Sequence, residues 1–377
     1  MSWSWPSYPE GYAYPNEFVE PIIWKPVIVG YTLLIAIASG LAIITSLAVI
    51  LRHKPLLRYV PLMNILGVSA YLVLLLGPLA DLRRPDHAIQ IFLSPHILPT
   101  SSTPGIAPIA IFALLWPVTF IVFSLTTLLI LSGDLYSKGG LRRLLALGLK
   151  SEADYEKYYG VARIAAVLLL ILGLVWAMYF PGLLFTAEAK LQLYNIYPLL
   201  PITYLLGSLI AAIFITSIAS ALIRIPLSTS LATILAASAF ASIAVKLIEY
   251  FRISVMLSGM PVVSSLINVS EPLIAISIAL LVSSMIIALY SMKKASTLPL
   301  ASAIGFLAVI IDRWIYAVTI QQVSKTGFAI FPAHIDLVEE LPIISLFALF
   351  IGIAFIISLI LPLRSVVLEK LGGGGYE

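Results

Sequence analysis

Long apolar runs separated by polar connections dominate the hydrophobic pattern of this chain. An α-helix needs about 20 predominantly apolar residues to cross the hydrocarbon core of a bilayer. The pattern therefore predicts an all-α integral membrane protein with about nine transmembrane helices. The segments that meet the requirement are residues 27–51, 59–79, 106–131, 161–186, 198–223, 229–248, 268–291, 296–319 and 341–363.

A weak internal similarity divides these helices into two sets. Residues 26–43, which include Ser39-Gly40, resemble residues 198–216, which include Gly207-Ser208. Internal repeats are common in membrane folds. We therefore predict two four-helix bundles, helices 1–4 and helices 5–8, plus one extra C-terminal helix. The predicted polytopic domain, 27–363, comprises a first bundle at 27–197, a second bundle at 198–319 and the extra helix at 341–363.

The two ends of the chain differ from this apolar body. Residues 1–26 lack the basic stretch and short apolar core of a cleaved signal peptide, and they are rich in Trp and Tyr. Such aromatic side chains commonly lie in the membrane interface. We predict an aromatic-rich extracytoplasmic segment at 1–26 and, because of four consecutive glycines, a flexible cytoplasmic tail at 364–377.

Composition narrows the class of protein further. The chain has 377 residues, of which 61% are hydrophobic and only 11% are charged, and its mean hydropathy is +1.07. Soluble domains contain about a quarter charged residues, so an ordinary globular protein is excluded. The absence of cysteine excludes a thiolate zinc site or an iron–sulfur cluster of the chain's own. The net charge of +4 is not gathered on one basic face, so we expect membrane lipid and no nucleic acid as a partner.

The distribution of charge predicts an orientation. With nine helices, the side that carries the loop 52–58 and the C-terminal tail holds 14 of the 22 Lys and Arg residues. The opposite side holds 12 of the 18 acidic residues. Because Lys and Arg favour the cytoplasmic side, we predict a multi-pass protein of the cytoplasmic membrane with its N-terminus outside and its C-terminus in the cytoplasm.

The histidines exclude one class of redox protein. A haem inside a helical bundle needs axial ligands, usually His, that face each other within the membrane. No predicted span contains a histidine in its interior, so we expect no haem. His87 and His96 share one loop and could bind a metal, but they lack a carboxylate partner at ligand spacing; solvent-exposed loop histidines are the favoured interpretation, and we predict no metal site.

Ionisable residues at membrane depth are candidates for function because burial of a charge is costly. Asp81 ends the second predicted helix, close to Arg83 and Arg84. One interpretation is a charge-paired helix end that reaches the interface. The other is an acid held near the interface by one of the arginines and positioned to exchange a proton.

Two later helices also contain charges. Lys246 and Glu249 are one turn apart, so they share a helix face, and we predict that they form a structural pair. Asp312 and Arg313 are adjacent and point about 100° apart on a helix, so at least one of them must face the bundle interior. They contribute either to a site or only to helix association.

A break in the fourth predicted helix is a further candidate. Tyr179-Phe180-Pro181-Gly182 interrupts the hydrogen-bond ladder, which is tolerated in lipid only beside other helices or a cavity. The break is either a simple kink or a slot for a flat apolar ligand. This break and the charged candidates all lie toward the predicted outer face.

The chain resembles the NrfD-like membrane subunits of polysulfide reductase and related enzymes, in pattern over most of residues 25–320. The order and spacing of several short motifs carry the resemblance. These motifs are Ala38-Ser39-Gly40, Leu79 to Pro85, Pro99 to Ser102, Phe180-Pro181-Gly182 followed by Asn195 and Pro198 to Pro201, and Ile311 to Trp314.

The resemblance implies a haem-free subunit that binds a menaquinone-type or similar quinone near the outer surface. It also implies two partner subunits on that face, an iron–sulfur electron-transfer subunit and a molybdopterin catalytic subunit. The iron–sulfur clusters and the molybdopterin are carried by these partners only, and the complex reduces a sulfur compound. By this resemblance we expect Asp81 to exchange protons and the quinone to contact Tyr31, Tyr179, Phe180, Arg83, Arg84 and Arg313. The chain departs from the family pattern at two of these positions, with Phe180 in place of the usual Tyr and Tyr31 in place of a His.

Two other functions remain open at this point. Nine helices, a possible repeat and charges in the sixth and eighth helices are compatible with a secondary transporter, although transporters usually place their site at the midplane. A passive membrane anchor without quinone chemistry is the other alternative.

Overall fold

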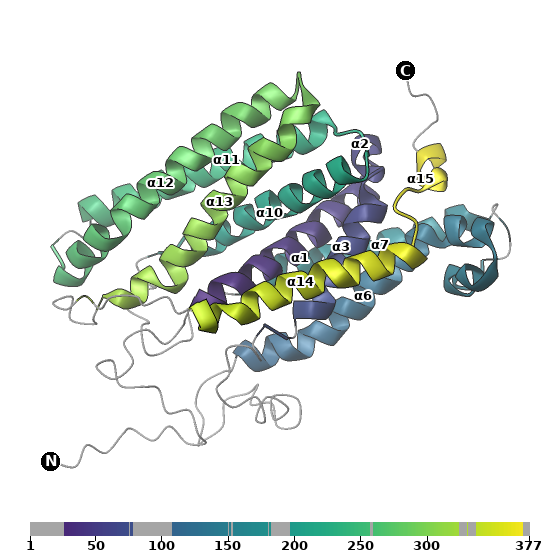
Figure 1. The fold of residues 1–377 in the computed structure, drawn as a ribbon, viewed down its shortest axis with the longest axis horizontal. Coiled ribbons are helices and arrows are strands. Elements are labelled where there is room, and N and C mark those ends of the chain that lie inside the picture. Colours follow the sequence, from purple (N-terminus) through teal and green to yellow (C-terminus); the bar gives the residue numbers. More distant parts are fainter. Residues whose placement is uncertain are drawn as a thin grey trace, which may run out of the picture.

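The computed structural model describes residues 26–74, 76–77, 108–149, 151, 154–179, 181, 197–256, 259–323, 330 and 337–371. Nearly all of these residues lie in helices that run roughly along one common direction (Figure 1). The main helices are α1 (Pro26–Ile50), α3 (Val60–Leu74), α6 (Pro108–Lys138), α7 (Tyr155–Ala177), α10 (Leu200–Leu222), α11 (Thr229–Phe251), α12 (Pro261–Ser291), α13 (Leu298–Ala317) and α14 (Leu337–Ile360).

The predicted all-α membrane fold is confirmed. In the described part of the chain, eight helices are long and apolar enough to cross a bilayer, and α3 is a shorter apolar helix. Each predicted segment overlaps one of these nine helices. Two helices begin earlier than predicted, α7 at Tyr155 and α12 at Pro261. In α7 the reason is a polar first turn, Tyr155 to Tyr158, which continues the hydrogen-bond ladder without adding hydrophobicity.

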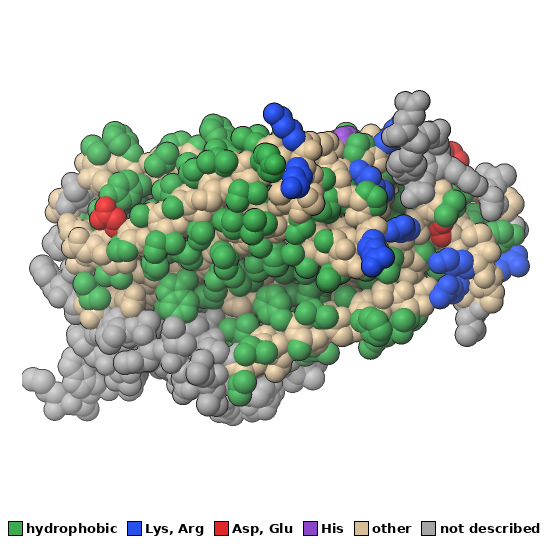
Figure 2. All heavy atoms as spheres, turned by 45° about the horizontal axis from the view of Figure 1, so that its top comes forward, with side chains coloured by type: hydrophobic (Ala, Val, Ile, Leu, Met, Phe, Trp, Pro, Cys, Tyr) green, Lys and Arg blue, Asp and Glu red, His purple; other side chains and the backbone are tan. Residues whose placement is uncertain are grey.

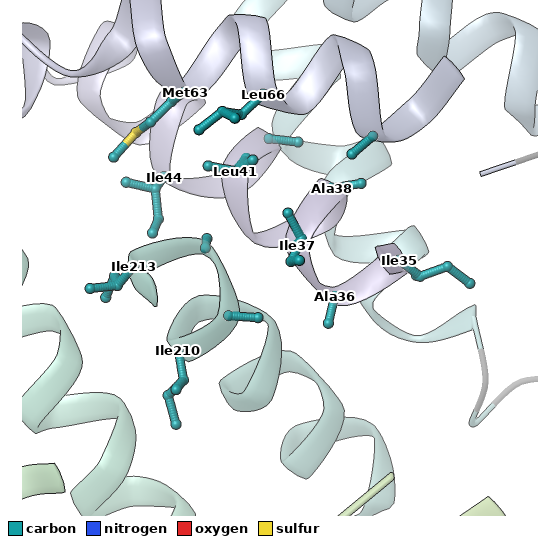
Figure 3. Close-up of a cluster of buried hydrophobic side chains, with 14 of the residues drawn as sticks. Ile35, Ala36, Ile37, Ala38, Leu41, Ile44, Met63, Leu66, Ile210 and Ile213 are labelled. Carbon is teal, nitrogen blue, oxygen red and sulfur yellow. The ribbon is translucent and has the colours of Figure 1, made fainter. Parts of the chain in front are cut away.

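Helix α1 lies at the centre of the molecule. It packs against α3 and α7 on one side, α10 and α13 on the other, and α14. These neighbours leave 89% of its most apolar window buried, which explains why the helix is apolar on every face. Figure 3 shows Ile37, Leu41 and Ile44 of α1 between Ile210 and Ile213 of α10 and the α3 side chains.

The remaining helices pack on either side of this axis. Helices α3 and α7 pack with α1, and α6 packs on α3 and α7; we call these four helices the first group. Helices α10, α11, α12 and α13 pack with one another, and we call them the second group. Helix α14 packs on α1 and α3 of the first group.

Small residues bring α1 and α10 unusually close together. A Cβ atom on Gly40 of α1 would lie 2.0 Å from the backbone oxygen of Ser208 on α10, a distance that no real side chain tolerates. Beside it, the Ser39 hydroxyl donates to the Ser208 hydroxyl at 3.2 Å. Small residues at such positions allow the close backbone approach on which helix association in lipid depends.

Lys and Arg side chains gather at one end of the molecule, and the flank between the two ends is mainly hydrophobic (Figure 2). Several of these arginines bind helix C-termini of other elements. Arg163 donates to the carbonyl oxygen of Ile50, Arg142 to that of Leu359, and Arg364 to those of Ile223 and Arg224. Cations at these positions satisfy the free carbonyls and oppose the negative end of the helix dipole.

The short helix α15 (Val366–Leu371) packs against α6 at the same end of the molecule. Asp134 of α6 accepts hydrogen bonds from the Ser365 hydroxyl and from the Val366 backbone N–H. Its carboxylate therefore caps the N-terminus of α15, where orphan N–H groups and the positive end of the helix dipole favour an anion.

The contact between α1 and α10 gives the first prediction. We expect Gly40→Ala to destabilise the protein by about 1–3 kcal/mol, since the methyl group forces two backbones apart. The matched control is Gly352→Ala in α14, where a Cβ atom meets nothing within 4 Å. Unfolding in mixed micelles, followed by tryptophan fluorescence, measures both variants. Equal stability of the two would contradict the assigned role of Gly40.

Candidate functional site

The first group contains a cluster of aromatic side chains around the ends of α1 and α7. The Tyr179 ring lies edge-on to Tyr31 of α1, with 6.2 Å between their centroids, and packs on Trp176 of α7 at 5.6 Å. Phe112 of α6 contacts Tyr179 at 4.4 Å. Tyr71 of α3 lies edge-on to Trp176 at 5.8 Å. We call these five residues the aromatic cluster.

The structure thus brings together two residues that the sequence analysis assigned to quinone binding, Tyr31 and Tyr179. Both are buried, with exposed fractions of 4% and 3%. They come from the start of α1 and the end of α7, which lie at the end of the molecule opposite the basic residues (Figures 1 and 2).

Hydrogen bonds fix the orientation of the cluster. The indole N–H of Trp176 donates to the Thr119 hydroxyl at 2.9 Å, and that of Trp116 donates to the Tyr71 carbonyl oxygen at 2.6 Å. The Tyr71 hydroxyl, in contrast, has no hydrogen-bond partner among the described residues. The ring of Tyr71 therefore contributes packing, and its hydroxyl makes no polar contact there.

The chain leads from this cluster toward Asp81. A Cβ atom on Gly77 would lie 2.7 Å from Cβ of Tyr31, so the backbone at Gly77 packs directly on that tyrosine. Asp81 follows four residues later, but it lies outside the described residues. The other predicted residues outside the described part are Arg83, Arg84, Phe180, His87 and His96.

The second group contains a buried ion pair between α11 and α13. Lys246 Nζ lies 2.5 Å from Asp312 Oδ1, and the exposed fractions of the two side chains are 2% and 10%. The hydroxyl of Ser277 on α12 donates to the same Asp312 oxygen at 2.6 Å. The prediction that Lys246 pairs with Glu249 is therefore wrong: Lys246 forms its salt bridge with Asp312 of α13 and not with the glutamate on its own helix.

Glu249 has different partners at the end of the same helix. One carboxylate oxygen accepts a hydrogen bond from the Leu199 backbone N–H at 3.1 Å, and the other accepts one from the Tyr316 hydroxyl at 3.2 Å. Leu199 is the N-cap residue of α10. The carboxylate therefore lies where the positive end of a helix dipole stabilises an anion.

Arg313 joins this second set of side chains. It donates to the Tyr204 carbonyl oxygen at 3.2 Å, and its Cζ lies 3.3 Å from the centre of the Tyr204 ring. The expectation that at least one of Asp312 and Arg313 faces the interior is confirmed, since both are buried. Its described partners place Arg313 among the second-group residues, whereas Tyr31 and Tyr179 lie in the aromatic cluster.

A small cavity of about 20 Å³ adjoins these charges, which is room for about one water molecule. Its polar lining comes from Lys246, Glu249, Tyr250, Tyr316, Ser270 and Tyr197. Tyr197 precedes α10, and burial raises the pKa of its hydroxyl, with Glu249 adding to the effect and a hydrogen bond with Ser270 opposing it. Tyr197 therefore stays a neutral phenol at physiological pH.

Sequence reasoning missed the partners of these charges. The tyrosines Tyr197, Tyr204 and Tyr316 carry no distinctive spacing that would have marked them. A signal did exist in α12, where buried serines recur every seven residues, at 270, 277, 284 and 291. That repeat places them on one helix face, and Ser277 is the one that contacts Asp312. In the described ranges, no group of three or more His, Cys, Asp or Glu side chains is arranged to hold a metal ion.

The buried ion pair gives the second prediction. Lys246→Met should destabilise the protein by about 3–5 kcal/mol, because it leaves the Asp312 charge buried without its cation. The double variant Lys246→Met/Asp312→Leu should recover most of that loss, since neither charge remains. Unfolding in mixed micelles measures both; a double variant no more stable than the single one would show that the pair is not the cause.

Comparison with known proteins identifies a relative along nearly the whole chain. No family model matches the sequence. A tetrathionate reductase subunit from Archaeoglobus fulgidus is 32% identical to the chain over 373 residues, which cover 97% of this chain and 98% of that protein. The similarity therefore extends over both groups of helices and α14, in agreement with the motif pattern seen in the sequence. The chain belongs to the NrfD-like family of membrane subunits.

Proposed function

We propose that the chain is a haem-free, quinone-interacting membrane subunit of an oxidoreductase complex that acts on a sulfur compound. In this proposal it exchanges electrons and protons between the quinone pool and an iron–sulfur partner subunit, which serves a molybdopterin catalytic subunit. The observation that carries the proposal is the meeting of Tyr31 and Tyr179 in the aromatic cluster, beside the backbone that leads to Asp81. The name of the Archaeoglobus relative supports the reductase assignment.

The aromatic cluster fits a quinone head group in its chemistry. A flat ring is bound well by aromatic faces, and a phenol hydroxyl can donate to a quinone carbonyl oxygen. In the proposed site, the Tyr31 and Tyr179 hydroxyls orient the head group, and Phe112 and Trp176 form its apolar wall. The presence of Tyr31 in place of the family's His retains a donor at this position.

Proton exchange in the proposed site falls to Asp81. A bound quinol supplies two electrons and two protons when it is oxidised. Asp81 accepts a proton as a carboxylate, and a neighbouring cation, Arg83 or Arg84, favours that charged form. The chain has no redox centre of its own in this proposal, so the electrons pass to a cluster of the partner subunit.

Charge distribution supports an outer position for the site. The basic residues gather at one end of the molecule (Figure 2), and α1, whose Tyr31 belongs to the aromatic cluster, begins at the other end (Figure 1). Lys and Arg favour the cytoplasmic side of membrane proteins. We therefore propose that the N-terminus and the partner subunits lie on the outer side of the cytoplasmic membrane, and that the C-terminus is cytoplasmic.

The complex can be tested directly by isolating the chain in mild detergent and measuring iron, molybdenum and extractable quinone. The proposal expects both metals from co-purifying subunits and about one quinone per complex. A chain that purifies alone and transports a solute in vesicles would favour the secondary transporter, for which the buried Lys246–Asp312 pair is the relevant feature. A metal-containing complex that transfers electrons without quinone would favour the passive anchor.

The third prediction concerns the tyrosine hydroxyls. Tyr31→Phe and Tyr179→Phe should each weaken quinone binding about two- to tenfold, the effect of one lost hydrogen bond. Tyr71→Phe is the matched control, because it changes the same cluster at a hydroxyl without a described partner. Quenching of tryptophan fluorescence by a short-chain naphthoquinone measures binding to the full chain. Equal affinities in all three variants would place the head group elsewhere.

The fourth prediction concerns Asp81. Asp81→Asn should lower quinol-dependent turnover of the complex at least about a hundredfold, since the amide cannot accept the proton, with little change in quinone affinity. Asp154→Asn, an exposed aspartate at the basic end, serves as the control. Wild-type turnover in Asp81→Asn would exclude this residue from proton exchange.

A further inference from the structure

Apart from Arg313, which the family resemblance assigns to the quinone, the charges of the second group have no role in the quinone proposal. Lys246, Glu249, Asp312 and Arg313 are all buried, with 7% or less of each whole residue exposed. Two cations and two carboxylates balance in charge, but burial of a charge is costly even when the charge is paired. Ionisable residues retained inside a membrane protein therefore call for a function.

Glu249 differs from Asp312 in its surroundings. Asp312 receives a salt bridge and a serine hydrogen bond on one oxygen, in the contact between α11, α12 and α13. Among the described residues, the hydrogen-bond donors to Glu249 are both neutral, Leu199 and Tyr316, and Glu249 lines the cavity. In this part of the chain, protonation of Glu249 therefore breaks no salt bridge, because Lys246 is paired with Asp312.

The cavity offers a proton a route to the Glu249 carboxyl group. Its volume of about 20 Å³ accommodates about one water, and it has enough polar neighbours to hold one. At the surface beside it, the Tyr250 hydroxyl donates to the exposed carboxylate of Glu271 at 2.8 Å. This contact links the cavity lining to a side chain on the surface of the molecule.

This proton route does not continue along the buried serines of α12 toward the end of the molecule that carries the basic residues. Ser284 donates to the Ala301 carbonyl oxygen at 2.8 Å, and a Cβ atom on the adjacent Gly305 would lie 2.7 Å from its hydroxyl oxygen. Helices α12 and α13 are therefore in direct contact at Ser284 and Gly305. Among the described residues, this contact separates Glu249 from the end of the molecule that carries the basic residues.

We propose that Glu249 is a proton-binding site distinct from the quinone site. A water in the cavity relays a proton from the solvent, accepting one proton as it donates another to the Glu249 carboxylate; the water is regenerated, Glu249 becomes a neutral carboxyl, and the charge of the four-residue cluster rises from zero to +1. The Lys246–Asp312 pair holds its own charges in balance during this step. The closed contact at Ser284 makes the site a one-sided store of a proton and not part of a channel.

Several ionisable groups face Glu249 and belong to its electrostatic environment. Lys246 and Tyr250 come from its own helix, Asp312 and Tyr316 from α13, and Tyr197 from the segment before α10. Glu271 of α12 contacts the site through Tyr250. Lys246 favours the charged carboxylate, whereas Asp312 opposes it.

Infrared difference spectroscopy on the purified full chain tests the proposal without any quinone or partner. Between acidic and alkaline buffer, we expect one carbonyl-stretch band of a buried protonated carboxyl group to appear, and to shift in D₂O because the cavity admits water. The band should be lost in Glu249→Gln and kept in Glu271→Gln, the exposed control.

A second variant covers the case in which Glu249→Gln does not fold. Tyr316→Phe removes one hydrogen bond to the carboxyl group, so it should move the same band to higher wavenumber without abolishing it. Absence of the band at every pH, persistence in Glu249→Gln, loss in Glu271→Gln, lack of a D₂O shift or an unmoved band in Tyr316→Phe would each overturn the proposal. These outcomes do not depend on whether the aromatic cluster binds quinone.

Discussion

The close approach of α1 to α10 determines how the rest of the molecule is arranged. At Gly40 the two backbones leave no room for even a methyl group, and Ser39 and Ser208 bond to each other beside that contact. Burial of apolar surface gives little driving force between helices in lipid, so close packing and polar contacts must hold them together. This contact joins the first group to the second.

Each group then carries polar chemistry of a different kind. The aromatic cluster of the first group is held by ring contacts and two indole hydrogen bonds, and it contains no charge. The second group is held by an ion pair between α11 and α13, to which a serine hydroxyl of α12 adds a hydrogen bond. A ligand with a flat, neutral ring suits the former environment, whereas exchange of a proton suits the latter. The two functions proposed for this chain therefore occupy separate sides of the α1–α10 contact.

The sequence was sufficient to predict the helices but not all of their contacts. Nine apolar runs give nine helices in the described part of the chain, because lipid requires every backbone group to bond within its own segment. Helix ends were less accurate, as at Tyr155, because apolar length does not register polar turns. The partner of Lys246 was wrong, since a shared helix face shows which residues are near but not which neighbouring helix offers the better acceptor. The meeting of Tyr31 with Tyr179 depended on family resemblance, as residues so far apart show no common pattern.

The arginines at the basic end have a consequence for how the protein keeps its orientation. Positive charges near helix ends guide insertion, and here Arg142, Arg163 and Arg364 bind the carbonyl ends of helices distant in sequence. Once the helices have assembled, these arginines are hydrogen-bonded to other helices, so a single helical hairpin can no longer carry them across the bilayer by itself. The charges that direct insertion thus also stabilise the final orientation. Reversing the topology of the folded protein would require breaking the hydrogen bonds of several arginines to helix C-termini at once.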